Sequence, residues 1–109
     1  FNTDNMKLLT GNIGISHNRY PTHGGFSHGE VQPFWTSVPY GIALAHNGNL
    51  TNYHQLAEDI TKKDSRYLNT TSDSEVLLHY FADQLHTNNP PESSEEFFYL
   101  LCSAVTKIF

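Results

Sequence analysis

The sequence predicts an α+β domain in which a small amount of β-structure precedes a run of helices. Three short segments in the first half of the chain have the patterning or composition of strands: residues 11–17, 31–35 and 42–45. Three segments in the second half have helical apolar periodicity: residues 51–62, 72–85 and 93–108. Because strands and helices come in separate runs and do not alternate, the elements should pack as layers of an α+β fold.

Each expected strand has its own signal. Residues 11–17 carry apolar side chains at alternate positions, between glycines. Pro33 interrupts residues 31–35, and a proline limits a strand to a short or edge position. Residues 42–45 read Ile-Ala-Leu-Ala, a continuous apolar run typical of a buried strand. Between the last two segments, residues 38–41 should form a turn.

An apolar stripe predicts each of the three helices. The stripes consist of Leu50, Tyr53, Leu56, Ala57 and Ile60, then Val76, Leu77, Tyr80, Phe81 and Leu85, then Phe97, Leu101, Ala104, Val105 and Ile108. Ser72 with Glu75 matches a capping box, in which each side chain satisfies a free backbone N–H at the helix start. Ser93 or Ser94 should cap the last helix, after the break at residues 90–91.

Composition excludes several classes of function. The net charge is −5 and the six Lys and Arg residues are scattered, so we expect neither a nucleic-acid nor an anionic-membrane surface. The chain lacks an apolar run of the ~18 residues that a membrane span needs. A single cysteine, Cys102, excludes an internal disulfide framework and indicates a reducing, cytoplasmic location. Seven histidines without HExxH or zinc-type spacing predict no metal site.

Three polar clusters could carry chemistry. Arg19 follows a predicted strand and precedes a glycine-rich loop, where its planar fork could bind a carboxylate or simply face solvent. Asn47 and Gly48 follow the strand at residues 42–45, so a side-chain amide and a backbone N–H could form an oxyanion hole. Asn47 and Gly48 could instead form an ordinary β-hairpin turn, but the segment that follows them is predicted to be a helix, not the second strand that a hairpin requires. Asp73 either complements a helix dipole or holds an ammonium group.

Read in order, four segments resemble one family. They are His17-Asn18-Arg19-Tyr20-Pro21-Thr22, Gln32-Pro33-Phe34, Gly41-Ile42-Ala43-Leu44-Ala45-His46-Asn47-Gly48-Asn49-Leu50-Thr51-Asn52 and Asn69-Thr70-Thr71-Ser72-Asp73-Ser74-Glu75. Together they look like the class II glutamine amidotransferase domain of the amidophosphoribosyltransferase family. The resemblance is strong over residues 11–81 and weak in the last helix. Gln-Pro-Phe and His-Asn-Gly-Asn-Leu favour this branch over glucosamine-6-phosphate synthase, whereas His23 is typical of that alternative.

The resemblance implies a fold and a glutamine-binding pocket. The fold would be that of an N-terminal-nucleophile hydrolase, with antiparallel sheets layered between helices in a four-layer αββα arrangement, here incomplete. Arg19 would bind the α-carboxylate of L-glutamine, with Thr22 and His23 lining the same pocket. Asp73 would hold the α-ammonium group. These substrate-binding roles agree with the chemistry of the clusters.

The resemblance also implies a catalytic apparatus. Asn47 through its side chain and Gly48 through its N–H would form the oxyanion hole. The nucleophile would be an N-terminal Cys whose own α-amine acts as the base. This chain begins with Phe1, and we expect Cys102 to be a buried, inert thiol inside a helix. Residues 1–109 are therefore expected to be an internal portion of one class II domain, lacking the N-terminal Cys strand and inactive alone.

In the intact protein, ammonia from glutamine would pass to phosphoribosyl pyrophosphate in a further phosphoribosyltransferase domain. The product, phosphoribosylamine, begins de novo purine biosynthesis. We expect no cofactor in the 109 residues, magnesium in the further domain, and a homo-oligomer. Two alternatives stay open: a glutamine-binding domain without a nucleophile, and an interaction domain without affinity for glutamine.

Overall fold

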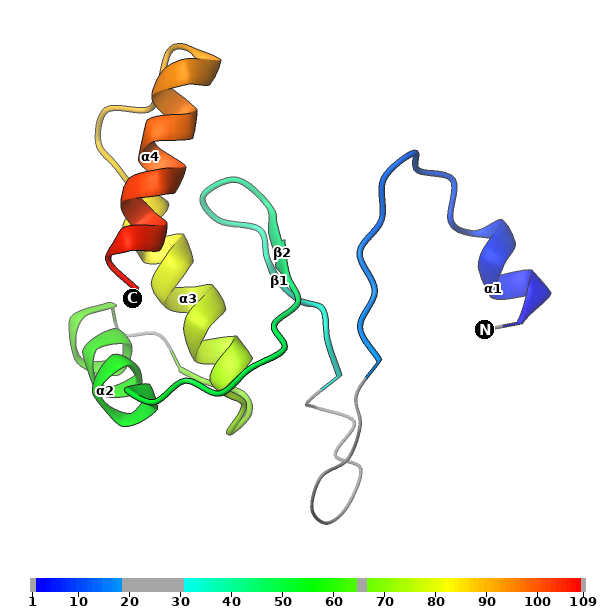
Figure 1. Ribbon diagram of the computed structural model, residues 1–109, viewed down its shortest axis with the longest axis horizontal. Coiled ribbons are helices and arrows are strands. Elements are labelled where there is room, and N and C mark those ends of the chain that lie inside the picture. The colour runs from blue at the N-terminus through cyan, green and yellow to red at the C-terminus, as the bar shows by residue number, and fades with distance from the viewer. Residues whose placement is uncertain (1, 19–30, 65–66, 109) are drawn as a thin grey trace.

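A computed structural model describes residues 2–18, 31–64 and 67–108. The elements are, in chain order, α1 (Thr3–Lys7), β1 (Phe34–Thr36), β2 (Ile42–Leu44), α2 (Tyr53–Asp64), α3 (Asp73–Leu85) and α4 (Ser94–Thr106). Helix α3 contacts α2, α4 and both strands, and so forms the centre of the molecule (Figure 1). The described part of the chain is therefore α+β, as its sequence predicts.

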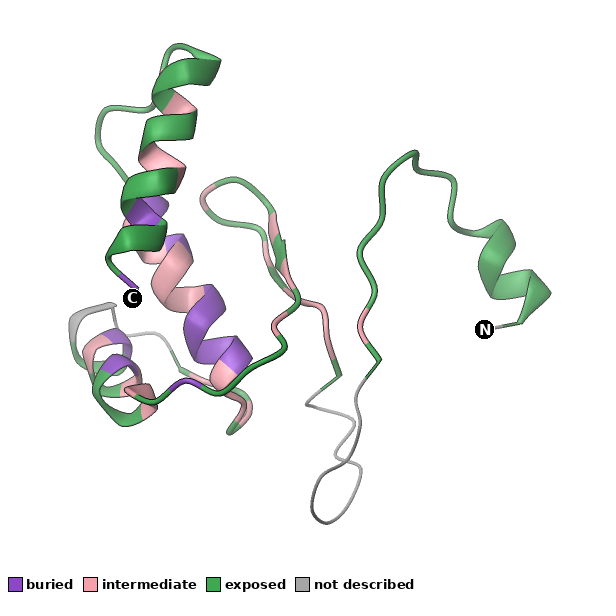
Figure 2. Ribbon diagram, viewed as in Figure 1, coloured by how far each residue is buried: buried purple, intermediate pink, exposed green. Residues whose placement is uncertain are grey.

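The core lies around α3, where the purple of buried residues is concentrated (Figure 2). One cluster of buried apolar side chains connects the N-terminal half of α3 to α2 and to the segment after α4. It consists of Leu50, Leu56, Ile60, Val76, Leu77 and Ile108. The stripes predicted for the first two helices are confirmed, with Tyr53, Ala57, Tyr80 and Phe81 partly buried against the cluster. Leu78 and Ala82 are also buried, because neighbours cover α3 on more than one side.

The two strands form an antiparallel hairpin, with Trp35 opposite Ala43. Strand β1 starts directly after Pro33, whose missing N–H disfavours pairing there. The expected turn at residues 38–41 is confirmed: Gly41 donates its N–H to the Ser37 carbonyl at 3.1 Å and has a φ of 67°. At this φ a side chain would be strained, so glycine suits the position.

The strand predicted at residues 11–17 is wrong. These residues have no strand geometry, and all but His17 are exposed, with Ile13 94% accessible. A strand needs backbone partners as well as alternation, and no described segment pairs with this one. Figure 1 shows residues 2–18 running away from the helices, with α1 at the far end. Helix α1, which the sequence did not predict, is wholly exposed and is capped by the Asn2 side chain, which accepts from Asn5 N at 2.8 Å.

The capping box predicted for α3 is wrong in its second half. Ser72 is the N-cap and accepts from Ser74 N at 3.3 Å. The buried Glu75 carboxylate instead faces the preceding loop, where it accepts from the backbone and side chains of Asn69 and Thr70 at 2.7–3.1 Å. Burial acts to raise the pKa of Glu75, but these four hydrogen bonds outweigh it and leave the pKa below its ordinary value.

Helix α4 corrects two further expectations. Ser93 caps it as expected, with Ala104 and Ile108 buried. Cys102 and Val105, however, are exposed rather than buried. Each residue turns a helix by ~100°, so Cys102 lies on nearly the opposite side from Ala104, away from α3. The stripe predicted for this helix is otherwise confirmed, because Phe97 and Leu101 are partly buried on the same side as Ala104 and Ile108.

The tip of the hairpin also meets α4. The rings of Tyr40 and Phe97 pack edge to face, with centroids 5.1 Å apart. No helix in the described residues is long and apolar enough to cross a membrane.

Candidate functional site

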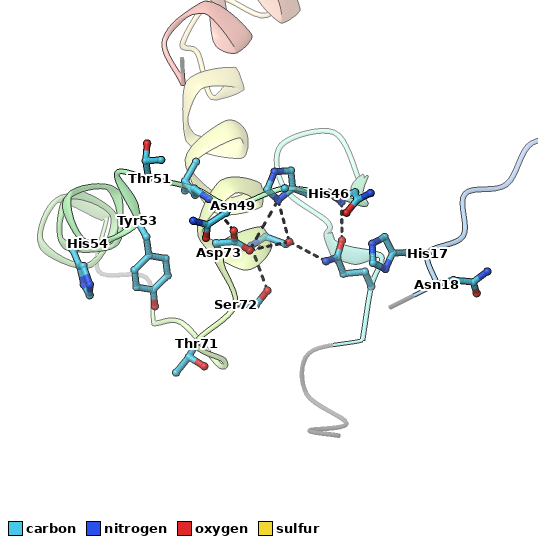
Figure 3. Close-up of a pocket in the computed structure, with 15 residues that line it drawn as sticks. His17, Asn18, His46, Asn49, Thr51, Tyr53, His54, Thr71, Ser72 and Asp73 are labelled. Atoms are coloured by element: carbon cyan, nitrogen blue, oxygen red, sulfur yellow. Dashed lines mark hydrogen bonds and ion pairs between the residues drawn. The ribbon is translucent and has the colours of Figure 1, made fainter. Parts of the chain in front are cut away.

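A polar cleft of about 800 Å³ opens at the N-terminal end of α3 (Figure 3). Its lining comes from four segments: residues 17–18, residue 32, residues 46–51 with 53–54, and residues 71–74. Asp73 lies in the middle, between Tyr53 and His54 on the α2 side and His17 on the opposite side. The cleft therefore collects polar residues that are far apart in the sequence.

The loop after β2 forms one wall of the cleft. Asn47, Gly48 and Asn49 are exposed there, between the end of the strand and buried Leu50. A Cβ on residue 48 would lie 2.7 Å from Nε2 of His46, closer than real contacts allow. The His46 ring packs directly over Gly48, so glycine is required unless that ring moves.

Asp73 ties this loop to α3. It is the first helical residue, where a carboxylate is favoured by the helix dipole. Its Oδ2 accepts from the Leu50 N–H at 3.0 Å, and its Oδ1 lies 3.4 Å from Ser74 Oγ and 4.0 Å from His46 Nδ1. The side chain is still 24% exposed. A carboxylate has about four acceptor positions, so Asp73 can bind a cation in the cleft while it holds Leu50.

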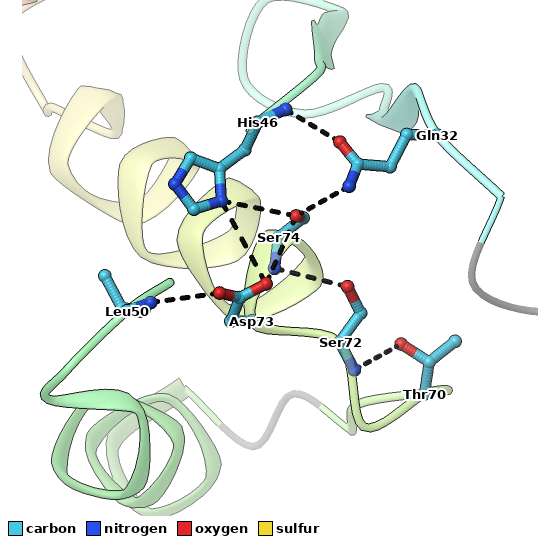
Figure 4. A network of polar contacts seen from close by, with 7 residues as sticks. All are labelled: Gln32, His46, Leu50, Thr70, Ser72, Asp73 and Ser74. Carbon is cyan, nitrogen blue, oxygen red and sulfur yellow. Dashed lines mark hydrogen bonds and ion pairs between the residues drawn. The ribbon is translucent and has the colours of Figure 1, made fainter. Parts of the chain in front are cut away.

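Gln32 makes a second tie across the same wall (Figure 4). Its Oε1 accepts from the His46 N–H at 2.7 Å, and its Nε2 donates to Ser74 Oγ at 3.0 Å. Ser74 is buried, and its Oγ lies 3.5 Å from His46 Nδ1. Sequence analysis assigns no role to Gln32 beyond its place in the Gln-Pro-Phe segment. The Gln-Pro-Phe segment is the sequence feature that could have pointed to Gln32, but it does not reveal which groups the side chain bonds.

Comparison with known proteins identifies the family. The profile of the glutamine amidotransferase domain matches residues 17–99. The chain belongs to this family. The matched range includes every segment that lines the cleft of this amidotransferase domain.

Three curated relatives of this amidotransferase domain share one name. The chain is 50% identical over 105 residues to an amidophosphoribosyltransferase of Pseudomonas aeruginosa, covering 96% of this chain and 21% of that protein. It is 54% identical over 85 residues to one of Escherichia coli, covering 78% and 17%. It is 46% identical over 89 residues to one of Saccharomyces cerevisiae, covering 82% and 18%.

The chain thus spans about a fifth of the length of these curated relatives. Their shared name supports the amidophosphoribosyltransferase branch over the glucosamine-6-phosphate synthase alternative.

Within the amidotransferase domain, the cleft brings together three of the six predicted site residues. Asn47, Gly48 and Asp73 all line it. The other three, Arg19, Thr22 and His23, lie outside the described residues. Cys102 is not among the residues that line the cleft. In the described ranges, no group of three or more His, Cys, Asp or Glu residues is arranged to hold a metal ion.

Proposed function

We propose that residues 1–109 are an internal portion of the glutaminase domain of a longer amidophosphoribosyltransferase. The intact protein hydrolyses L-glutamine and passes the ammonia to phosphoribosyl pyrophosphate. The product is phosphoribosylamine, in the first step of de novo purine biosynthesis. Membership of the amidotransferase family and the shared name of the relatives support this proposal.

The observation that carries the proposal is the shared cleft of Asn47, Gly48 and Asp73. Asn47 and Gly48 are more than twenty positions from Asp73 in the sequence, yet all three line one polar cavity. A bound amino acid needs an anion for its ammonium group and donors for the carbonyl that reacts. In the proposal, Asp73 holds the α-ammonium group, and the Asn47 amide and Gly48 N–H stabilise the oxyanion.

The remaining parts of the glutaminase lie outside the described residues. Arg19 binds the α-carboxylate, and Thr22 and His23 line the same pocket. The nucleophile is a Cys at the mature N-terminus, upstream of these residues, in an N-terminal-nucleophile hydrolase fold of four αββα layers. The transferase portion uses magnesium, and the intact enzyme is a cytoplasmic homo-oligomer.

The proposed reaction has two half-steps. The α-amine of the Cys takes the thiol proton as the sulfur attacks the side-chain amide carbon of glutamine, and the carbonyl electron pair moves to the oxygen to give a tetrahedral oxyanion. Collapse of this intermediate breaks the C–N bond, and ammonia leaves with a proton delivered by the α-amine of the Cys. Water then attacks the thioester, releases glutamate and restores the thiol. Both tetrahedral species place negative charge beside Asn47 and Gly48.

Asn47→Ala in the full-length protein tests the oxyanion assignment. An oxyanion donor acts in the transition state, so its loss should lower glutamine-dependent kcat by about 10²–10³, or ~3–4 kcal/mol, with KM nearly unchanged. Activity with free ammonia should be retained, because that reaction bypasses the cleft. Turnover and Tm are measured on one preparation. A lower Tm with intact turnover would show that Asn47 only shapes the loop.

Asp73→Asn tests the binding assignment and should have the opposite kinetic signature. Loss of the charge that faces the ammonium group should raise KM for glutamine about tenfold, corresponding to ~1.4 kcal/mol, with a smaller change in kcat. The Asn oxygen can still accept from Leu50, so the fold should persist. Equal loss of glutamine-dependent and ammonia-dependent activity would refute the assignment. A wild-type protein that binds glutamine and releases no glutamate would instead support the non-catalytic alternative.

A further inference from the structure

The loop between β2 and α2 depends on side chains from elsewhere. Within the described chain, residues 46–49 make no backbone-to-backbone hydrogen bond outside the helices and strands. The loop is held at one end by the His46 N–H on Gln32 and at the other by the Leu50 N–H on Asp73. Asn47 and Gly48 lie between these two points.

The Gln32 side chain suits this task because its amide carries an acceptor and a donor. The backbone N–H of His46 can only donate, so the atom that meets it at 2.7 Å must be the amide oxygen. The amide nitrogen then points to Ser74 Oγ at 3.0 Å. Ser74 belongs to α3 and is 1% exposed, so the loop is tied to a rigid part of the core.

We propose that Gln32 is a positioning residue that fixes Asn47 and Gly48 for oxyanion stabilisation. The proposal rests on the function proposed above. By holding His46 N–H and Ser74 together, Gln32 sets both the direction in which the chain enters Asn47 and the place of the His46 ring that packs over Gly48. Oxyanion donors act only when they are aimed at the developing charge, so a residue that aims them affects the transition state.

The two ends of the loop therefore have separable kinetic effects. Asp73 is bonded to Leu50 independently of Gln32, so the ammonium site should survive when Gln32 is replaced. Loss of Gln32 should lower kcat for glutamine and spare KM. Partial unfolding of the domain would also lower the apparent kcat at unchanged KM, so kcat is compared per folded protein, with Tm measured on the same preparation.

The experiment compares Gln32→Met with Gln32→Ala in the full-length protein. Met keeps most of the side-chain volume but removes both hydrogen bonds. Both variants should lower glutamine-dependent kcat about tenfold, with KM changed less than about threefold and ammonia-dependent activity retained. Ser74→Ala leaves the bond to His46 but frees Gln32 from α3, and should give a smaller loss of the same kind. Gln84→Ala, in which the lost amide bonds only Asp83 among the described residues, is the matched control and should behave as wild type.

A double-mutant cycle connects Gln32 to its target. If Gln32 acts through the oxyanion donors, Gln32→Met in an Asn47→Ala background should cost much less than the tenfold seen alone. Additive losses, or wild-type kcat in Gln32→Met, would overturn the proposal. If Asn47→Ala alone leaves turnover normal, the assignment of Asn47 fails, while Gln32 is still decided by the kcat and KM of Gln32→Met.

Discussion

Two loops meet at the N-terminal end of α3, and they are held in different ways. The loop before the helix is held by Glu75, whose buried carboxylate accepts four hydrogen bonds. The loop after β2 is held at single points by Gln32 and by Asp73, whose side chain stays 24% exposed. Glu75 and Asp73 are only two positions apart. The Glu75 carboxylate holds the preceding loop, whereas the Asp73 carboxylate faces the cleft. The loop before α3 is thus held firmly by four hydrogen bonds. The neighbouring loop after β2 is held by fewer bonds and lines the cleft, where it can contact a ligand.

Replacing Glu75 should have the largest effect on stability. Glu75→Ala leaves the part-buried N–H groups of Asn69 and Thr70 without their acceptor, and also removes the acceptor of both side chains; an unsatisfied donor costs up to ~1–3 kcal/mol where water cannot replace the bond. We expect the free energy of unfolding to fall by about 3 kcal/mol in urea titrations. The exposed Glu95 of α4 gives the control, and Glu95→Ala should cost under ~1 kcal/mol. Equal losses in the two variants would show that the four hydrogen bonds do not stabilise this loop.

Replacing Gly48 should affect the other loop, with a smaller effect on stability. In Gly48→Ala the new methyl group would displace the His46 ring, which lies 2.7 Å from the position of the added Cβ. Overpacking of this kind costs ~1–3 kcal/mol. Because the loop is otherwise exposed, we expect Gly48→Ala to lower glutamine turnover more than it lowers stability. Gly14→Ala is the matched control, since its Cβ meets no atom within 4 Å. Normal turnover in Gly48→Ala would mean that the ring moves freely.

Acidification should produce the smallest effect, through the Glu75 carboxylate. The pKa of Glu75 is lower in the folded protein than its ordinary 4.5, so ionised Glu75 stabilises the fold above that value. This contribution should begin to disappear as the pH falls below about 4.5, and should be lost once the pH passes the lowered pKa. The difference in unfolding free energy between wild type and Glu75→Ala should therefore shrink over that range. A difference that is constant with pH would contradict the linkage.

The sequence anticipates the elements that bury a regular stripe. Helices α2 and α3 follow their apolar periodicity, and Ser93 starts α4 by a local capping signal. The β2 segment is a strand, but in an antiparallel hairpin in which Ala43 is exposed, because an apolar run does not specify what covers it. Alternation at residues 11–17 fails for the same reason, since a strand depends on a partner that local pattern does not encode.

The cleft contains three residues that the sequence singles out, but their contacts could not be predicted. Asn47, Gly48 and Asp73 line one cleft, although each also has a purely local explanation in the sequence. The partners of Gln32 and Glu75 were missed, because these bonds depend on which way a side chain turns after the chain has folded. For Gln32 the partner in α3 is 42 positions away, beyond any periodicity.

Leu50 belongs to both the core and the cleft. Its side chain packs with Ile60 and Val76, while its N–H is bonded to Asp73. A substitution that shortens this side chain would shift the backbone atom that orients the carboxylate. If Asp73 has the binding role proposed above, selection for thermal stability and selection for substrate affinity act on the same residue. Over evolutionary time Leu50 should be less free to drift than Ile60, whose side chain serves the core alone.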